Sequence, residues 1–525
     1  METPALLLGV LVAVGVLLLI AYRTRIPYPI VLVAGSVGLG FLPATPDVQI
    51  EPDVILVGVL PPLLYAAAFF SNLHEMKDNL RPIGLLAIGL VLFTTVTVGV
   101  VAHEVVGLSW PVAFTLGAIV SPTDAVSATA IAGRLGAPRR YVTIIEGESL
   151  VNDATALIAY KFAVAAVVTG TFSLAEAAGS FLLEAAAGIA VGLLVGWLIL
   201  LLRRRIRDAP TEITITLMTP YLAYLPAEEL GVSAVLAAVT AGIYLGWHAP
   251  SITDAATRLQ SFAVWETVVF LLNSFLFVLV GLQLPGVIED ISSVPTATLL
   301  RDGLVVAATV IAVRFLWVFP AMWSPRRTDD GSWQRAHPRQ VRFVILVGWT
   351  GMRGALSLAA ALAIPLTVDG GGAFPERQLV IFLVYAVILV TLLGQGLALP
   401  SLIRWAGVGD GDLIARQEAA ARRRAAEVAI ARIDELLDED WVREKSARRM
   451  RQLYEFRVKR FDAQLDDEDD GTLEDRSLAF QRLRREVLEA EREEIVRLRN
   501  AGDIDDDTMH RIEHDLDLED VRLDI

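Results

Sequence analysis

The sequence predicts an all-α polytopic membrane protein with a helical tail. Of its 525 residues, 54% are hydrophobic, and apolar runs of about 20 residues, the length that spans a bilayer as a helix, recur through the first 405. From about Gly407 the hydropathy collapses and charged residues take over. These two observations exclude a water-soluble fold for most of the chain. They divide it into a membrane domain at 1–405 and a polar domain at 406–525.

Thirteen apolar segments are obtained by cutting the chain at its charged and turn-rich breaks. They begin near Leu6, Pro27, Asp53, Pro82, Trp110, Thr143, Leu174, Thr211, Val232, Phe262, Thr298, Arg342 and Arg377. The first has an acidic residue before it and no small-residue cleavage site after it, so we expect a retained helix rather than a signal peptide. If segments one to six and eight to thirteen are two halves, the chain is built from inverted repeats.

Lysine and arginine gather in alternate loops between these segments. The basic loops lie around Arg23, Lys77, Arg139, Arg203, Arg258 and Arg326. The other loops, around Asp47, Gly107, Gly170, Glu229, Glu289 and Gly371, hold essentially none. By the positive-inside rule the basic loops are cytoplasmic. We therefore expect a plasma membrane (bacterial inner membrane) protein with its N-terminus outside and its C-terminus in the cytoplasm.

The polar domain is predicted to be a solvated helical tail. Ala415 to Leu437 and Trp441 to Leu465 have the pattern of charged amphipathic helices, and a further helical stretch lies near Leu478 to Leu498. Acidic residues crowd into the last 120 positions, which explains the net charge of -15. Charge runs of this kind usually stay in water or meet partners. We expect a cytoplasmic regulatory tail that can bind a regulator.

Several function classes are disfavoured by what the sequence lacks. The chain has no cysteine, which rules out disulfides and thiolate chemistry. The tail contains no nucleotide-binding loop. We expect no cofactor, no nucleic-acid partner and no enzymatic activity.

Four ionisable residues lie within the predicted spans at one depth: Asp124, Asp153, Arg314 and Arg353. Each is ten or eleven residues from the cytoplasmic end of its span, which at about 1.5 Å per residue is roughly 15 Å. That is about half of a roughly 30 Å hydrocarbon core. A charge there costs several kcal/mol unless it is paired or lines a cavity, so such residues are functional candidates by default.

Two spans are predicted to break at this depth. Pro122, two residues before Asp124, removes a backbone donor and clashes with the preceding turn. In the twelfth span, Gly348, Gly351 and Gly354 fall within seven residues. Interrupted helices at matching places in inverted repeats indicate the midplane site of a transporter.

Oxygen ligands converge near these breaks. In the sixth span, the four-residue spacing places Ser149 and Asp153 on one face, and Glu148 and Asn152 on the adjoining one. The candidate ligand set for a transported monovalent cation is Asp153, Asp124, Ser149 and the Thr123 backbone. Carboxylate, hydroxyl and carbonyl oxygens suit hard cations. Because two close carboxylates raise each other's proton affinity, a proton and a metal ion can compete for the same charge.

Glu148 is expected to have a structural role instead. An ion pair with Arg314 or with Arg353 would neutralise it within the membrane. If Asp124 and Asp153 also served only in ion pairs with these arginines, the broken helices and the nearby hydroxyl groups would have no explanation. Glu146 is expected to line a funnel on the cytoplasmic side.

These residues resemble the cation:proton antiporters of the NhaP and mammalian sodium/proton exchanger type. The matching stretches are Leu60-Pro61-Pro62-Leu63-Leu64, Thr123-Asp124, Gly147-Glu148-Ser149-Leu150-Val151-Asn152-Asp153, Arg314, and Gly351-Met352-Arg353-Gly354-Ala355. The resemblance covers about the first 405 residues. It implies thirteen helices in an NhaA-like inverted-repeat antiporter fold, with a core domain that moves in an elevator-like or rocking manner against a dimerisation domain in a homodimer.

The resemblance also implies roles for single residues. Asp153 would be the carboxylate that exchanges ions, with Asp124, Ser149 and Thr123 as further ligands, and Glu148 would pair with Arg314. Asn152 stands where the electrogenic branch carries a second aspartate, which implies electroneutral exchange of one Na⁺ or Li⁺ for one H⁺. Many relatives carry an acid shortly after Pro61-Pro62, where this chain has Tyr65-Ala66-Ala67-Ala68. A third carboxylate ligand is therefore not expected there.

Three alternatives stay open on the sequence. Potassium could be the main cation, because a ligand set alone does not fix ion size. A passive channel would conduct cations without proton coupling. An intramembrane aspartyl protease would use two membrane aspartates as a dyad, but the Gly-x-Gly-Asp context of such enzymes is missing.

Overall fold

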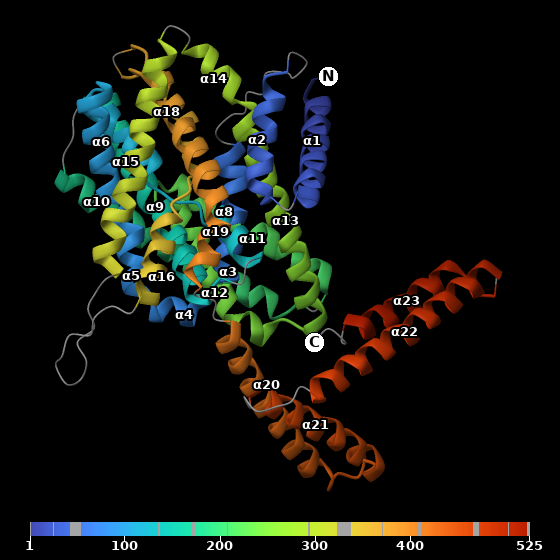
Figure 1. The fold of residues 1–525 in the computed structure, drawn as a ribbon. Helices are drawn as coiled ribbons and strands as arrows, with labels where there is room; N and C mark the ends of the chain where they lie inside the picture. Colours follow the sequence, from blue (N-terminus) through green and yellow to red (C-terminus); the bar gives the residue numbers. More distant parts are fainter. Residues whose placement is uncertain are drawn as a thin grey trace, which may run out of the picture. The chain divides into compact units, whose positions relative to one another are not determined.

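A computed structural model describes residues 2–24, 26–42, 54–134, 137–170, 174–206, 208–291, 294–322, 338–369, 371–407, 411–465, 472–501 and 503–521. These residues are almost entirely helical (Figure 1). The chain divides into two compact units, Met1–Gly409 and Asp410–Ile525. Each unit is described by itself.

The first unit contains nineteen described α-helices. They are α1 (Glu2–Thr24), α2 (Tyr28–Gly40), α3 (Leu60–Phe69), α4 (Leu73–Asp78), α5 (Leu80–Gly84), α6 (Val91–Val101), α7 (Trp110–Val120), α8 (Ala125–Arg134), α9 (Arg139–Thr169), α10 (Leu174–Arg203), α11 (Ala209–Glu229), α12 (Ala234–Ile252), α13 (Ala255–Leu282), α14 (Leu284–Asp290), α15 (Thr296–Met322), α16 (Pro338–Trp349), α17 (Ala355–Leu362), α18 (Arg377–Leu389) and α19 (Gly396–Ala406). Short π-helical stretches at Val54–Val59, Leu85–Leu90, Ala102–Val106 and Val390–Gln395 adjoin α3, α5, α6 and α18.

Eight described helical segments are long and apolar enough to cross a membrane. They are Leu80–Val106, Trp110–Gly133, Arg139–Thr169, Gly179–Arg203, Ala234–Ile252, Ala255–Asp290, Thr296–Met322 and Arg377–Ala406. Four shorter apolar helices, Val12–Thr24, Tyr28–Gly40, Val54–Phe69 and Gln340–Trp349, correspond to further predicted segments. The remaining one is α11, which has two internal prolines and is not among the eight. The multi-pass character of the chain is confirmed, and the count of thirteen spans stays a prediction.

Local sequence explains where several helices begin and end. The Asp208 carboxylate accepts a hydrogen bond from the Thr211 backbone N–H at the start of α11 (3.0 Å), and Ser233 accepts one from Leu236 at the start of α12 (3.3 Å). Such side-chain caps satisfy backbone donors that the first turn leaves free. Gly170 ends α9 with a φ of 71°, a left-handed conformation that glycine adopts without strain.

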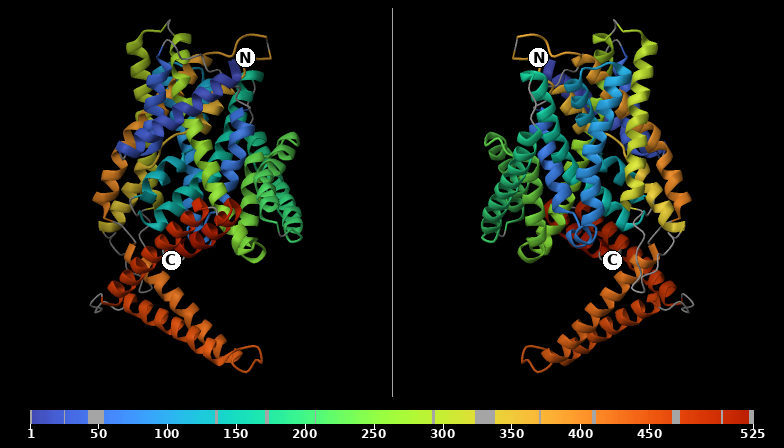
Figure 2. Two further views of the ribbon diagram at one scale, coloured as in Figure 1. Left: turned by 90° about the vertical axis from the view of Figure 1, so that its right-hand side faces the viewer. Right: turned by 90° about the vertical axis from the view of Figure 1, so that its left-hand side faces the viewer.

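The helices of this unit include two packed groups. In one, α7 packs against α6 and α9, and α15 packs against α16 and α18. In the other, α10, α11 and α12 pack on one another, and α12 also contacts α3; Figure 2 shows this group, teal to green, at one side of the unit. Gly188 and Gly192 of α10 face the backbone of α12, where a Cβ would collide with the carbonyl oxygens of Ser233 and Ala237. Small residues at four-residue spacing let two membrane helices approach closely.

The second unit consists of two helical pairs. Helix α20 (Gly411–Leu436) packs against α21 (Glu444–Leu465), and α22 (Thr472–Ala501) packs against α23 (Asp506–Val521). The three helices predicted in the tail correspond to α20, α21 and α22, although the first prediction ends one residue after α20 and the second begins three residues before α21. Exposed ion pairs such as Arg423 with Asp462 (3.2 Å) join the helices of a pair. The regulatory role and cytoplasmic location of this unit stay predictions.

Candidate functional site

Two interrupted helices meet at the site. Helix α7 ends at Val120 and α8 begins at Ala125, with Pro122 in the gap. Helix α16 ends at Trp349 and α17 begins at Ala355, with five residues between them. The interruptions predicted from Pro122 and from the three glycines are both present. The two extended segments contact each other directly, because the Asp124 backbone N–H donates to the Met352 carbonyl (2.8 Å).

Arg353 stabilises this meeting point through backbone carbonyls. Its Nε donates to the Val120 carbonyl (2.8 Å), and its two terminal nitrogens donate to the Gly351 carbonyl and to the Ser121 carbonyl (3.5 Å). The last carbonyls of a helix have no intrahelical partner and carry partial negative charge, so the guanidinium neutralises the end of α7. The sequence left open whether Glu148 pairs with Arg314 or with Arg353. Among the described residues Arg353 forms no ion pair, and its guanidinium contacts are with backbone carbonyls.

Asp124 lies at a helix N-terminus, directly before the start of α8, whereas Arg353 binds the C-terminal end of α7. Its Oδ1 accepts from the Val126 backbone N–H (2.9 Å) and its Oδ2 accepts from the Ser127 hydroxyl (2.6 Å). A carboxylate is stabilised at a helix N-terminus by these donors and by the helix dipole. Gly354 packs against this carboxylate, because a Cβ at Gly354 would lie 2.6 Å from Oδ2.

Glu148 pairs with Arg314. The two guanidinium nitrogens donate to Glu148 Oε1 (2.5 Å) and Oε2 (2.9 Å), and the side chains are 1% and 0% exposed. Arg314 also donates to the Val347 carbonyl, which precedes the break in α16 (3.3 Å). The structure thus selects Arg314 from the two arginines that the sequence left open. This bidentate pair carries no net charge.

Thr123 joins the break in α7 to helix α9. Its hydroxyl donates to Glu148 Oε1 (3.0 Å) and accepts from Asn152 Nδ2 (2.9 Å). Its carbonyl accepts from the Ser149 hydroxyl (3.1 Å) and more weakly from Asn152 (3.4 Å). Two candidate cation ligands, the Ser149 hydroxyl and the Thr123 carbonyl, are therefore already in contact.

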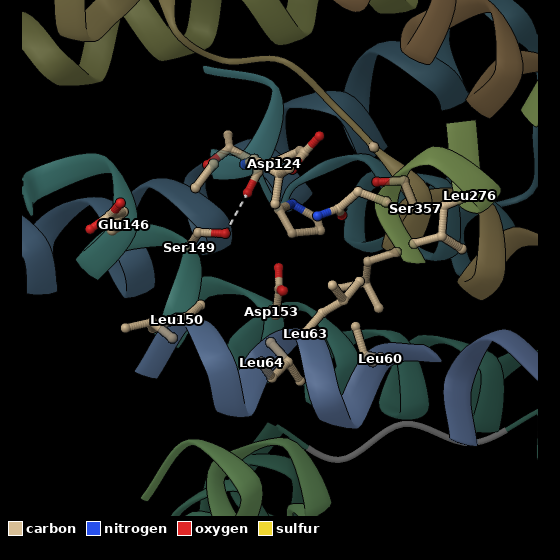
Figure 3. A pocket seen from close by; sticks show the side chains of 18 of the residues that line it. Leu60, Leu63, Leu64, Asp124, Glu146, Ser149, Leu150, Asp153, Leu276 and Ser357 are labelled. Atoms are coloured by element: carbon tan, nitrogen blue, oxygen red, sulfur yellow. Dashed lines mark hydrogen bonds between the residues drawn. The ribbon is translucent and has the colours of Figure 1, made fainter. Parts of the chain in front are cut away.

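Asp153 faces a cavity of about 110 Å³ together with these groups (Figure 3). Its side chain is 8% exposed, and within the part of the chain that the structure describes it accepts no hydrogen bond and forms no ion pair. The lining residues are Leu60, Leu63, Leu64, Ala67, Pro122, Thr123, Asp124, Ala125, Val126, Glu146, Ser149, Leu150, Asp153, Asn273, Leu276, Phe277, Gly354, Leu356 and Ser357. The cavity can hold several water molecules or an ion.

The structure brings together most of the predicted site. Asp153, Asp124, Ser149 and Thr123 all line the cavity, whereas Asn152 lies behind it against Thr123. Glu146 also lines the cavity, two helical turns from Asp153 along α9. Glu148 is paired with Arg314 and Asp124 is held by donors at the start of α8, whereas no described residue bonds to the carboxylate of Asp153 beside them. Such a group can hold either one proton or one monovalent cation.

Sequence reasoning missed two polar features. Asn273 of α13 lines the cavity, and it could have been found as a polar residue inside an apolar span. Arg203 was assigned to a loop, yet it is buried and pairs with Glu212 of α11 (2.5 Å). Thr253 accepts from the same arginine (2.9 Å). This second network lies among α10, α11 and α12 rather than at the cavity.

A helical membrane protein in which two interrupted helices meet beside buried carboxylates has the architecture of a secondary transporter. A sequence model of the family described as "Sodium/hydrogen exchanger, transmembrane" matches residues 9–405. The chain belongs to this sodium/hydrogen exchanger family. It is a multi-pass antiporter of that family, and the family comprises transporters rather than enzymes, which removes the support for the protease alternative.

Relatives and a solved structure agree with this placement. An uncharacterised Na⁺/H⁺ exchanger of Mycobacterium tuberculosis is 37% identical over 98% of this chain and 95% of the relative. A sodium, potassium, lithium and rubidium/H⁺ antiporter of Bacillus pumilus is 35% identical over 72% of this chain and 58% of the relative. The structure of the sodium proton antiporter MjNhaP1 from Methanocaldococcus jannaschii has a TM-score of 0.61 at 18% identity, and the match covers 77% of this chain and 99% of that one. This likeness shows a shared fold.

Proposed function

We propose that the protein exchanges one Na⁺ for one H⁺ across the plasma membrane, with Asp153 as the carboxylate that carries either ion. The observation that carries the proposal is the position of Asp153. It faces a cavity lined by the Ser149 hydroxyl and by Thr123 and Asp124, and no described residue occupies its oxygens. Carboxylate, hydroxyl and carbonyl oxygens are the ligands that hard cations prefer.

Competition for Asp153 couples the two ions. A proton on Asp153 removes the charge that attracts Na⁺, and a bound Na⁺ opposes protonation. Na⁺ binding at one side of the membrane therefore releases a proton, and protonation at the other side releases Na⁺. Exchange is expected to slow as the pH falls on the side where Na⁺ binds, because protons then occupy the carboxylate.

Electroneutral exchange follows from the residues around Asp153. Asn152 is neutral and donates to Thr123, while Glu148 is neutralised by Arg314. Asp124 is held by donors at the start of α8. If only Asp153 changes its occupant, one proton is exchanged for one monovalent cation.

Potassium is the second candidate cation. The Bacillus pumilus relative is named for sodium, potassium, lithium and rubidium. The donor set proposed here is compatible with each of these ions, because it contains no feature that fixes ion size. We further propose a homodimer that serves pH and sodium homeostasis, and a tail in the cytoplasm that regulates exchange.

Proteoliposomes with an acidic interior test the proposal. Adding Na⁺, Li⁺ or K⁺ outside should alkalinise the interior, and the order of the cations gives the selectivity. The initial rate should stay unchanged when the membrane potential is set to different values. A rate that follows the potential would contradict one-for-one exchange. Cation current without proton movement would favour the channel alternative.

Single cysteines test the proposed topology, since the natural chain has none. Ser251→Cys lies in the exposed last turn of α12 on the predicted cytoplasmic side, and Thr296→Cys lies at the first residue of α15 on the predicted outer side. In intact cells a membrane-impermeant maleimide should label the cysteine at 296 and leave the one at 251 unlabelled. The reverse pattern would invert the proposed orientation.

A further inference from the structure

One wall of the cavity carries a polar side chain that the proposed site does not use. Helices α3 and α13 contribute seven lining residues, and six of them are apolar. The seventh is Asn273, in the apolar middle of α13. Figure 3 shows Leu276, one turn further along α13, beside the same cavity as Asp153 and Asp124. The carboxamide therefore belongs to the wall that closes the cavity around the two acids.

Among the residues that the structure describes, no side-chain hydrogen bond to the Asn273 carboxamide is found. The residue is 4% exposed, its Nδ2 is buried without a hydrogen-bond partner, and across the described ranges no side-chain hydrogen bond joins it to another residue. A buried amide without a partner loses its hydrogen bonds to water and gains none in exchange, which destabilises the fold. A leucine of similar volume would be cheaper at this position if the side chain only filled space.

A carboxamide has properties that fit the cavity. Its oxygen is a neutral ligand for a hard cation, while its NH₂ group donates two hydrogen bonds. Rotation about the last side-chain bond exchanges the two ends in nearly the same space. The oxygen can therefore face a bound cation, and the nitrogen can face an ionised carboxylate or a water molecule when no cation is present.

We propose that Asn273 is a further ligand of the transported cation, which it contacts through its side-chain oxygen directly or through one water molecule. This inference rests on the proposed function. It adds a neutral ligand from α13 to the acids and the hydroxyl from α8 and α9. Because an amide does not titrate, Asn273 sets cation affinity and selectivity and leaves the proton count unchanged.

Asn273→Leu is the primary test, with Ser274→Ala as its matched control. Ser274 is the next residue of α13, is 0% exposed and also lacks a hydrogen-bond partner for its hydroxyl, but it does not line the cavity. Both variants remove an unpartnered buried polar group from the same helix. A difference between the KM values of the two variants therefore reports the contact that Asn273, and not Ser274, makes with the cavity.

We expect Asn273→Leu to raise the KM for Na⁺ about tenfold, the effect of losing one ligand to a charged group. The KM for Li⁺ should change by a different factor, because the two ions differ in size. The maximal rate should change less than the KM, and the melting temperature should stay the same or rise. Ser274→Ala should keep the wild-type KM for both ions. A wild-type KM for Na⁺ and Li⁺ in Asn273→Leu would overturn the proposal.

Asn273→Asp keeps the test decisive if the leucine variant does not fold. It retains an oxygen ligand of the same shape and adds charge to a cavity that already contains Asp124, Asp153 and Glu146. The added charge should lower the KM for Na⁺ at alkaline pH and move the pH profile of exchange to higher pH, since each nearby acid then binds protons more tightly. An unchanged KM and pH profile would overturn the proposal.

Transport by the wild-type protein separates a failure of the proposed function from a failure of the role of Asn273. If wild-type protein shows no cation-driven proton movement, the proposed function fails. If the wild type exchanges ions and both Asn273 variants have its KM and cation order, only the role of Asn273 fails.

Discussion

Glu148 and Arg314 illustrate how a buried charge is tolerated beside an ion site. Moving either charge out of water costs several kcal/mol, and the attraction between them offsets this only with good geometry and further hydrogen bonds. Here the pair is bidentate, and Thr123 and the Val347 carbonyl supply additional bonds. The pair thereby holds α9, the α7 break and α16 together.

Removing one partner of this pair should be strongly destabilising. Glu148→Gln leaves the Arg314 charge buried without compensation, and we expect it to lower the free energy of unfolding by about 3–5 kcal/mol. Denaturant unfolding of the purified protein in detergent measures this. Glu184→Gln is the control: its pair with Lys161 is long, at 4.0 Å, and Lys161 is 58% exposed, so a change of about 1 kcal/mol or less is expected. Equal effects of the two changes would contradict the structural role of the pair.

At the residue scale, the sequence predicted which side chains lie together at the cavity better than it predicted their partners. Depth along a helix follows from a fixed rise per residue, so the common level of Asp124 and Asp153 was predictable. The partner of Glu148 depends on how helices pack side by side. The sequence places Arg314 and Arg353 at the same expected depth, and only the structure shows that Arg314 binds Glu148 whereas the guanidinium of Arg353 contacts carbonyls.

At the scale of elements, the two broken helices form the scaffold of the site. Arg353 holds the end of α7, Asp124 caps the start of α8, and the backbone bond from Asp124 to Met352 joins the two breaks. The breaks themselves were predictable from Pro122 and from three clustered glycines, because these act on local backbone geometry. The contact between the breaks was not, since it joins residues far apart in the chain.

Arg353→Lys tests this scaffold without changing its charge. A lysine cannot reproduce the fork of a guanidinium that contacts several carbonyls, so we expect exchange to fall about tenfold or more as the ligands lose their alignment. Arg301→Lys is the control, because Arg301 is 59% exposed and pairs with the neighbouring Asp302. The measurement is the initial rate of Na⁺-driven proton movement in each of the two variants and in the wild-type protein. Wild-type rates in Arg353→Lys would show that charge alone suffices.

At the scale of the whole molecule, the chain combines a membrane unit with a polar helical unit. The change in composition near Gly407 predicted this division, because a polar, acidic segment cannot share an apolar core. The compact units separate after Gly409. The number of spans was harder to predict from hydropathy, since α11 carries internal prolines and several helices are short.

Truncation after Gly409 tests the role of the second unit. Helices α20 to α23 pair among themselves, so we expect the truncated chain to insert, fold and exchange ions. If the tail regulates exchange, the pH profile should shift relative to the full chain. Proton movement in proteoliposomes across a range of pH measures this, with melting temperature as the control for folding. An identical rate and pH profile would contradict a regulatory tail.

If Asp153 alone carries the exchanged ions, Asp153→Asn should abolish exchange. In proteoliposomes with an acidic interior, external Na⁺ should alkalinise the interior with the wild-type protein and should have no effect with the variant, because an amide of the same shape cannot exchange a proton for a cation. Glu184→Gln, which also neutralises an acid in the membrane unit, should retain exchange. Na⁺-driven alkalinisation by folded Asp153→Asn at the wild-type rate would contradict the account.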